Sequence, residues 1–287
     1  MNKRHKYDYH VASDDHNHVA HKIVQMVGQG KRVLEIGAGP GSITRILRGQ
    51  AGCRITAVEL DSEALPSLRP LCEQVFQRDL NEPCWSDGLA VEGGYDVIVA
   101  ADVLEHLVDP WQALASLKPL LATEGFLVIS LPHAGHNAVI AALLNGDFRY
   151  YEWGLLDRTH IRFFGIKNIE NLFSEAGYLI DDFGYVLYQP ETTELATFWH
   201  ALPVTMQQAL RESAFGTVYQ VVIKASIAEG SQRTTLHLAP PGPVTACSLA
   251  EKCRDRLRQW LPAPIRRRLR KTLNALQAKE QGPEHGA

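Results

Sequence analysis

The sequence has no hydrophobic run long enough to span a bilayer. Its longest apolar stretch, 138–144, ends at Asn145-Gly146-Asp147, far short of the roughly 18 residues that a membrane helix needs. The first ten residues are polar and charged, unlike a secretory signal peptide. The five cysteines form no CxxC pair, which argues against a structural zinc site or a disulfide framework. These absences predict a cytoplasmic protein.

The main body of the chain also lacks the basic character of a nucleic-acid-binding core. The whole chain carries a net charge of −3, and the residues from 229 onward hold eleven Lys and Arg against five Asp and Glu. That segment is therefore +6 and the first 228 residues are −9. We expect no nucleic-acid partner.

Strand-like and helix-like segments alternate along most of the chain. The predicted strands are 32–36, 54–60, 74–77, 95–101, 125–131, 178–187 and 217–226. The predicted helices are 42–48, 62–72, 110–121 and 167–176. Strands that are apolar throughout are typical of parallel sheets buried on both faces. The pattern predicts an open, mostly parallel α/β sheet, with ligands at the carboxyl ends of its strands.

The chain is expected to divide into four parts. Residues 1–30 form an amino-terminal lid segment, and residues 31–227 form the α/β domain, with a substrate-side insertion at 132–166. Residues 228–247 are rich in Pro, Gly, Ser and Thr, which is typical of a linker. Residues 248–279 have the pattern of a basic amphipathic helical tail.

A glycine-rich turn gives the strongest local signal. The predicted strand 32–36 runs into Gly37-Ala38-Gly39-Pro40-Gly41 and then into a helix. Glycines there let a ligand approach bare backbone. The spacing is GxGxG, whereas the dinucleotide-binding fingerprint is GxGxxG. The carboxylate of Glu35, just before the turn, suits a cationic ligand end and would repel a pyrophosphate.

Acidic residues follow the next strands. Glu59 closes the second strand, where a carboxylate accepts hydrogen bonds from ribose hydroxyls. Asp79 follows the third strand and is placed to accept from an adenine amino group, with Leu80 against the ring. Asp102 follows the fourth strand. The alternatives are a solvated strand end for Glu59 and a turn cap for Asp79.

Four ordered segments, VLEIGAGPG, AVELD, RDL and YDVIVAADVLEHLVDP, resemble the motifs of class I S-adenosylmethionine (SAM) dependent methyltransferases over residues 33–131. The resemblance implies SAM as cofactor and a Rossmann-like, seven-stranded, mostly parallel sheet whose last strand, 217–226, is antiparallel. The cofactor-binding residues that it implies are Glu35, Gly37, Ala38, Gly39, Gly41, Glu59, Leu60, Asp79, Leu80, Asp102 and Val103.

Segments outside this core resemble a bacterial methyltransferase subgroup associated with glycosyltransferases and surface-polysaccharide biosynthesis. They are residues 7–21, NGDFRY at 145–150 and LLDRTHIRFF at 155–164. The resemblance implies O-methylation of a sugar or glycan. The Glu105-His106 segment resembles small-molecule methyltransferases instead, so a quinone-like hydroxyl or a carboxylate is an alternative acceptor. A SAM-binding scaffold without turnover is the third reading.

A hydroxyl acceptor loses a proton during methyl transfer, and histidine is the usual base near neutral pH. Three residues in or after the loops at the strand ends are candidate catalytic residues: His160, Asp102 and His133. His160 is preferred because Arg158 and Arg162 flank it and favour its neutral form. The alternatives are a capping role for His160 beside an Asp157–Arg158 pair, or no side-chain base.

The same segment supplies candidate substrate contacts. Arg158 and Arg162 are placed to hold a phosphate or carboxylate by bidentate hydrogen bonds. Tyr150 and Trp153 are placed to stack on a sugar face.

The amino-terminal segment holds five histidines at 5, 10, 16, 18 and 21, but their spacing matches no metal motif. We predict no metal and expect a lid over SAM, with Tyr7, Tyr9 and His16 near the cofactor.

The tail begins with a capping box, Ser248-Leu249-Ala250-Glu251, and holds a basic run at 266–271. A basic amphipathic helix suits the inner face of an anionic membrane, a protein partner, or packing on the acidic body. The sequence leaves these three open.

Overall fold

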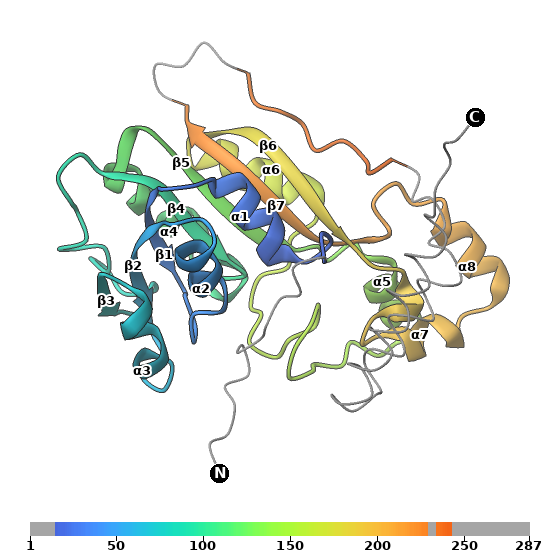
Figure 1. The fold of residues 1–287 in the computed structure, drawn as a ribbon. Coiled ribbons are helices and arrows are strands. Elements are labelled where there is room, and N and C mark those ends of the chain that lie inside the picture. Colours follow the sequence, from blue (N-terminus) through green and yellow to red (C-terminus); the bar gives the residue numbers. More distant parts are fainter. Residues whose placement is uncertain (1–14, 229–233, 243–287) are drawn as a thin grey trace, which may run out of the picture. The chain divides into compact units, whose positions relative to one another are not determined.

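The computed structural model describes residues 15–228 and 234–242 (Figure 1). The predicted tail at 248–279, Tyr7 and Tyr9 lie outside the described residues. Among the helices of the described part, none has the length and apolarity to cross a membrane.

A single seven-stranded sheet organises the part of the chain that the structure describes. Its strands are β1 (Arg32–Ile36), β2 (Arg54–Glu59), β3 (Gln74–Gln77), β4 (Tyr95–Ala101), β5 (Leu121–Pro132), β6 (Tyr178–Leu187) and β7 (Val218–Ile227). The spatial order is β3-β2-β1-β4-β5-β7-β6. Strand β7 lies antiparallel between β5 and β6, and the other neighbours are parallel. The predicted fold class and the antiparallel last strand are confirmed.

Successive residues of the central strands are buried on opposite faces of the sheet. Leu34 and Ile98 belong to one apolar cluster, and their neighbours Val33 and Val97 belong to another. This arrangement explains why these strands are apolar at every position.

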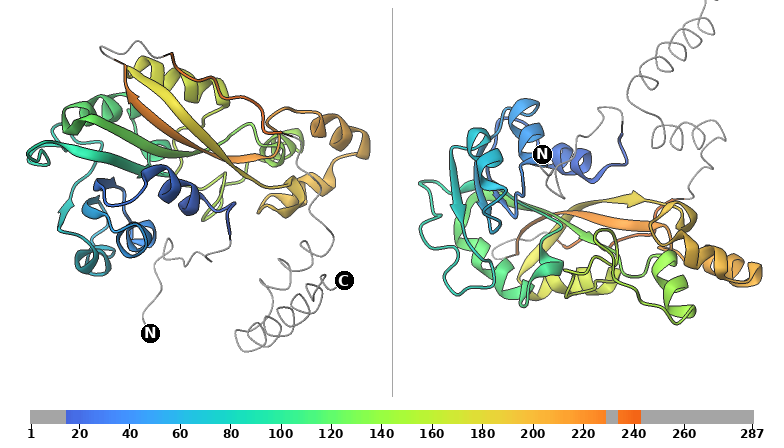
Figure 2. Two further views of the ribbon diagram at one scale, coloured as in Figure 1. Left: turned by 45° about the horizontal axis from the view of Figure 1, so that its top comes forward. Right: turned by 90° about the horizontal axis from the view of Figure 1, so that it is seen from below.

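Helices cover both faces of the sheet, as Figure 2 shows. The cluster of Val33 includes buried residues of α1 and α2, and the cluster of Leu34 includes buried residues of α4 and α6. These helices are α1 (Val19–Val27), α2 (Ser42–Gly49), α4 (Pro110–Leu117) and α6 (Ile166–Glu175). The short helix α3 (Leu65–Leu68) packs beside β2 and β3 through the buried side chain of Leu68.

Besides α1, three described helices carry no helix prediction from the sequence. They are α5 (Asn137–Leu144), α7 (Ala196–Ala201) and α8 (Val204–Arg211). Helix α5 is apolar nearly all round, so it shows no helical stripe. Helices α7 and α8, between β6 and β7, span six and eight residues, too short for a clear period. The predicted helix 62–72 is also shorter, with α3 followed by a 3-10 turn at Arg69–Leu71.

The expected lid segment contributes a helix to the core. Val19, Ala20, Ile23 and Val27 of α1 are buried and pack with residues of β1, β5 and β7. His18 caps this helix by accepting a hydrogen bond from the Ala20 amide at 3.2 Å. Residues 19–27 therefore form part of the helical layer on this face of the sheet.

Part of the expected linker packs on the domain. The amide of Leu236 donates to the carbonyl of Ile180 at 2.9 Å, and that of Leu238 donates to Glu170 Oε1 at 2.7 Å. The Leu238 side chain is buried in the cluster of α4 and α6. Residues 236–238 therefore lie along β6 and α6.

His136 fixes the start of α5. Its Nδ1 accepts from the Ala138 amide at 3.1 Å, and its Nε2–H donates to the carbonyl of Tyr188 at 2.9 Å. Both nitrogens are used by the neutral ring, and burial lowers the pKa of His136 from 6.5 to about 4. Protonation would cost the Nδ1 bond, so this residue links the fold to pH.

We predict that protonation of His136 lowers the free energy of unfolding in acid. Between pH 6.5 and pH 4 the unfolded imidazole binds a proton that the folded one does not, so stability is full above pH 6.5 and falls below it. At about 1.4 kcal/mol per pH unit, the loss by pH 5 is about 2 kcal/mol. Urea unfolding at pH 7 and pH 5 measures it, and His136→Asn, which keeps a capping side chain, should remove it. Exposed His200→Asn is the control, and equal acid sensitivity in both variants would contradict the prediction.

Candidate functional site

The glycine-rich turn joins β1 to α2 at the carboxyl edge of the sheet. Gly37, Gly39 and Gly41 have φ values of 66°, 53° and 85°, which favour glycine. A Cβ added to Gly37 would lie 2.5 Å from Val103 Cγ2. Ala38 is buried beside Leu68 and shapes the floor of the turn. The turn therefore presents bare backbone, with Val103 packed against it.

Glu59 connects this turn to the end of β2. Its carboxylate accepts hydrogen bonds from the Gly39 amide at 2.6 Å and the Asp61 amide at 2.8 Å. Carboxylate oxygens have further lone pairs, so Glu59 retains capacity to accept from ribose hydroxyls.

Glu35 is a buried carboxyl before the turn. It accepts from Thr44 Oγ1 at 2.7 Å, and burial raises its pKa to about 7, with Glu59 adding to the shift. A cationic group at the turn would favour the ionised form of Glu35.

The next strand ends carry the predicted adenine-side residues. Asp79 and Leu80 are half-buried, and the Leu60 side chain is 56% exposed. Asp79 accepts from the backbone amide and side-chain amide of Asn81, at 2.9 and 3.1 Å. This is the turn-capping alternative, and it leaves the second carboxylate oxygen of Asp79 available. Bare backbone, carboxylate acceptors and an exposed leucine at one edge fit the polar, cationic and apolar parts of SAM.

Asp102 directly follows β4 and has an uncommon backbone conformation. Its φ is +53°, in the left-handed region that is rare for residues other than Gly, Asn and Asp. Its carboxylate accepts from Ser130 Oγ and Gln220 Nε2, both at 2.7 Å. Burial raises the pKa of Asp102, and these two hydrogen bonds oppose the shift. Ser130 on β5 and Gln220 on β7 thus hold Asp102, and no local sequence pattern marks either residue for this role.

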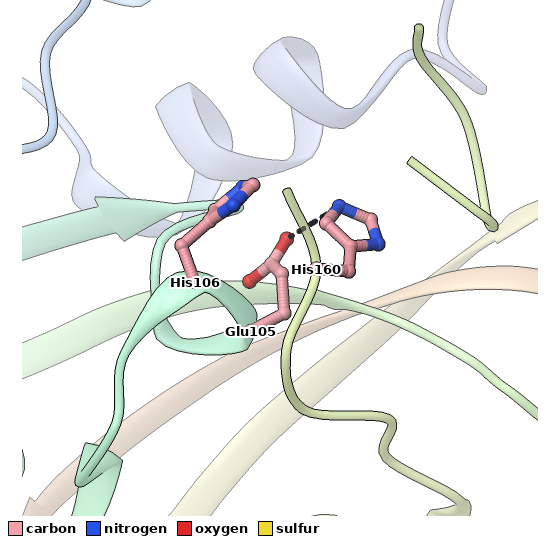
Figure 3. Close-up of side chains that lie close together, drawn as sticks. All are labelled: Glu105, His106 and His160. Atoms are coloured by element: carbon pink, nitrogen blue, oxygen red, sulfur yellow. Dashed lines mark ion pairs between the residues drawn. The ribbon is translucent and has the colours of Figure 1, made fainter. Parts of the chain in front are cut away.

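Glu105, His106 and His160 converge beyond the end of β4 (Figure 3). Glu105 and His106 lie in a 3-10 turn, Leu104–His106, and His160 comes from the insertion. His160 Nε2 is 3.9 Å from Glu105 Oε1, and the two imidazole ring centroids are 4.9 Å apart. The structure brings together residues 55 positions apart in the chain.

Backbone hydrogen bonds hold this cluster. The Glu105 carbonyl accepts from the amides of Ile161 and Arg162 at 2.9 and 3.0 Å. His106 Nδ1–H donates to the Thr159 carbonyl at 3.0 Å, and His160 Nδ1–H donates to the Leu155 carbonyl at 3.3 Å. The insertion is therefore fastened to the turn after β4.

Glu105 is fully buried, and neither carboxylate oxygen has a hydrogen-bond partner. Burial raises its pKa well above the ordinary range, and Asp102 and Asp157 add to the shift. In the sequence, Glu105 stands out only as part of the segment that it shares with His106, because a residue after a strand is equally consistent with a surface position.

His133 is buried elsewhere on the sheet edge. Its Nδ1–H donates to the Val218 carbonyl at 3.2 Å, and its amide donates to the Tyr219 carbonyl at 2.9 Å. Burial lowers the pKa of His133. These bonds tie His133 to β7. Its role as a base stays a prediction.

The two predicted anion-binding arginines have protein partners. Arg158 pairs with Glu152 at 3.0 Å, and both side chains are largely exposed. Arg162 donates to the Val108 carbonyl and lies 5.8 Å from the Trp111 ring centroid. The Asp157 carboxylate accepts from the amide and hydroxyl of Thr159, at 3.0 and 2.8 Å.

Aromatic side chains adjoin the cluster on the insertion. The Phe163 ring lies 6.4 Å from the His160 ring and 5.5 Å from Phe148, and Tyr150 lies 5.8 Å from Phe148. Tyr150 and Trp153 are 53% and 59% exposed. They are accessible to a ligand, as the prediction of stacking requires.

Comparison with known proteins agrees with this architecture. A family model described as a methyltransferase domain matches residues 8–182. A ubiquinone biosynthesis O-methyltransferase of Psychrobacter arcticus is 27% identical over 178 residues, which are 60% of this chain and 68% of that protein. Another, from Thiobacillus denitrificans, is 26% identical over 168 residues, 57% of this chain and 71% of that protein.

Solved structures share the fold. A protein of Bacillus halodurans C-125, assigned as a methyltransferase, superposes with a TM-score of 0.52 at 16% identity, covering 72% of this chain and 97% of that one. A chain of the complex between the Haloferax volcanii Trm112 methyltransferase activator and a methyltransferase gives 0.51 at 15% identity, covering 75% and 91%. With the family match over more than half of its length, the chain belongs to the methyltransferase-domain family and is a SAM-dependent methyltransferase.

Proposed function

We propose that this methyltransferase acts on a hydroxyl group of a small aromatic molecule of the quinone-precursor kind. The observation that carries the proposal is the group of Glu105, His106 and His160 beyond β4, with aromatic side chains beside it. Proton-accepting groups at this position suit an acceptor that loses a proton, and aromatic rings suit a flat acceptor.

The names of the relatives support an acceptor of this class. Those described above are called ubiquinone biosynthesis O-methyltransferases. They favour the small-molecule alternative over a sugar or glycan, which stays a prediction from the resemblance of 145–164. Arg158 and Arg162 already interact with Glu152 and the Val108 carbonyl. These contacts count against a pair of arginines reserved for a phosphate group.

The turn between β1 and α2 is the proposed SAM site. Glu59 would accept from the ribose hydroxyls, Asp79 from the adenine amino group, and Leu60 and Leu80 would cover the ring. Glu35 would favour the cationic amino-acid end by charge. SAM supplies a methyl group on a positively charged sulfur.

In the proposed step, the acceptor oxygen forms a bond to the methyl carbon as the carbon–sulfur bond breaks. His160 would take the hydroxyl proton, and the nearby Glu105 carboxylate would stabilise the resulting imidazolium. Asp102, held by Ser130 and Gln220, would position the turn that carries Glu105. The chain's part is to align the oxygen with the methyl group and to exclude water.

We predict that Gly37→Ala weakens SAM binding at least tenfold. The added Cβ would lie 2.5 Å from Val103 Cγ2, and the φ of 66° is unfavourable for alanine, so the turn must shift. Calorimetric titration with SAM and with S-adenosylhomocysteine measures the effect. Gly49→Ala in α2 is the matched control, because a Cβ there meets nothing within 4 Å. A folded Gly37→Ala protein with unchanged affinity would place the cofactor elsewhere.

We predict that the chain methylates catechols and related phenols and that His160→Ala lowers kcat by about 100-fold. Transfer of a radiolabelled methyl group from SAM to a panel of phenols, aromatic carboxylates and sugars identifies the acceptor class. His200→Ala is the control, since that side chain is exposed on α7.

Each outcome of the panel has a distinct meaning. Label in sugars alone would replace the proposal with the glycan reading. SAM binding without label in any acceptor would favour a scaffold. Equal rates for His160→Ala and wild type would remove His160 from the proposed step.

A further inference from the structure

The two histidines of the cluster are held as metal ligands usually are. Each uses Nδ1–H to donate to a backbone carbonyl, His106 to Thr159 at 3.0 Å and His160 to Leu155 at 3.3 Å. Such a bond fixes the tautomer and places the lone pair on Nε2. For His160, Nε2 is the atom that lies 3.9 Å from Glu105 Oε1.

Glu105 supplies a second and independent observation. A carboxylate with no exposed surface and with both oxygens lacking hydrogen-bond partners is costly in a folded protein. Neutral imidazole rings at His106 and His160 do not offset the cost of burying the Glu105 carboxylate. A cation between the three side chains would relieve it.

We propose that Glu105, His106 and His160 bind a divalent transition metal ion. One possible ligating atom of each residue, a ring nitrogen or a carboxylate oxygen, lies within 4.8 Å of those of the other two. Shifts of about 1–2 Å in side-chain position would reach the separations that ligands about 2 Å from zinc require. Two imidazoles and one carboxylate are a donor set for Zn²⁺, Mn²⁺ or Fe²⁺, whereas Mg²⁺ and Ca²⁺ prefer oxygen ligands. Three protein ligands leave room for an oxygen of the acceptor.

The charges around the cluster suit a cation. Asp102 and Asp157 both act on Glu105 by like-charge repulsion. Their carboxylates are engaged by other groups, Asp102 by Ser130 and Gln220 and Asp157 by Thr159. The carboxylates of Asp102 and Asp157 would not be ligands, but their negative charges would lie near the ion and offset its positive charge.

A metal here would change how the acceptor loses its proton, and this consequence rests on the proposed function. Coordination lowers the pKa of a bound hydroxyl, so its proton would pass to water. His160 would then be a ligand rather than a base. Binding of the metal itself does not depend on the identity of the acceptor.

Metal titration of the full chain tests the proposal. Protein treated with a chelator and then desalted is titrated with Zn²⁺ by calorimetry and with Co²⁺ by visible absorption. We expect one equivalent bound by the cluster, with affinity reduced at least tenfold in Glu105→Gln and in His160→Ala. Glu124→Gln and His200→Ala are matched exposed controls and should bind as the wild type does.

Two further variants keep the test decisive. His106→Ala removes a half-buried ligand, so it serves if the changes at buried Glu105 perturb folding. A variant with His5, His10, His16, His18 and His21 replaced by Ala separates the cluster from the amino-terminal histidines. Zn²⁺ should raise the Tm of this variant and of wild type, but not that of Glu105→Gln.

The outcomes are clear in both directions. Loss of the tight equivalent in the cluster variants alone supports the site. Unchanged affinity in Glu105→Gln, or loss only with the amino-terminal histidines, overturns it. The assay contains neither SAM nor acceptor, so a failed acceptor panel leaves its result intact.

Discussion

The candidate site depends on one backbone carbonyl, that of Glu105, which accepts hydrogen bonds from the amides of Ile161 and Arg162. These bonds join the insertion to the turn after β4 and so place His160 beside Glu105 and His106. Because the bonds use main-chain atoms, they set the position of the loop without demanding particular side chains at 161 and 162. The aromatic side chains of the insertion are brought to the site by the same junction.

The fold was predictable because its signals are local. Apolar strands of five to seven residues, separated by helices and ending in a glycine turn, specify a parallel sheet with its ligand edge. The turn at Gly37 needs glycine for two reasons present in the chain itself, a positive φ and the contact with Val103. Helices α7 and α8 escaped prediction because they are short, and no residue of α8 is buried.

The site was only partly predictable, because its geometry depends on contacts between distant segments. The sequence marks His160 as a candidate, yet nothing local shows that Glu105 is its neighbour 55 residues away or that the carboxylate is buried without hydrogen bonds. His133 has the same residue type and lies after a strand, but its hydrogen bond goes to β7. Residue type and position after a strand do not distinguish the two histidines, and both donate from Nδ1 to a backbone carbonyl. His160 differs in that its Nε2 lies 3.9 Å from Glu105 Oε1.

The buried carboxyl groups of this protein show how environment separates structural from functional roles. Glu194 is also buried with a raised pKa, but it accepts from the Leu155 amide at 2.7 Å and from the Tyr219 hydroxyl, so its desolvation is compensated within the fold. Glu35 has Thr44. Neither carboxylate oxygen of Glu105 has such a hydrogen-bond partner, and the two rings in its cluster already donate through Nδ1 to backbone carbonyls. A carboxyl that the fold leaves uncompensated at a ligand-binding edge is a group whose partner comes with the ligand, as an ion, a proton or an acceptor hydroxyl.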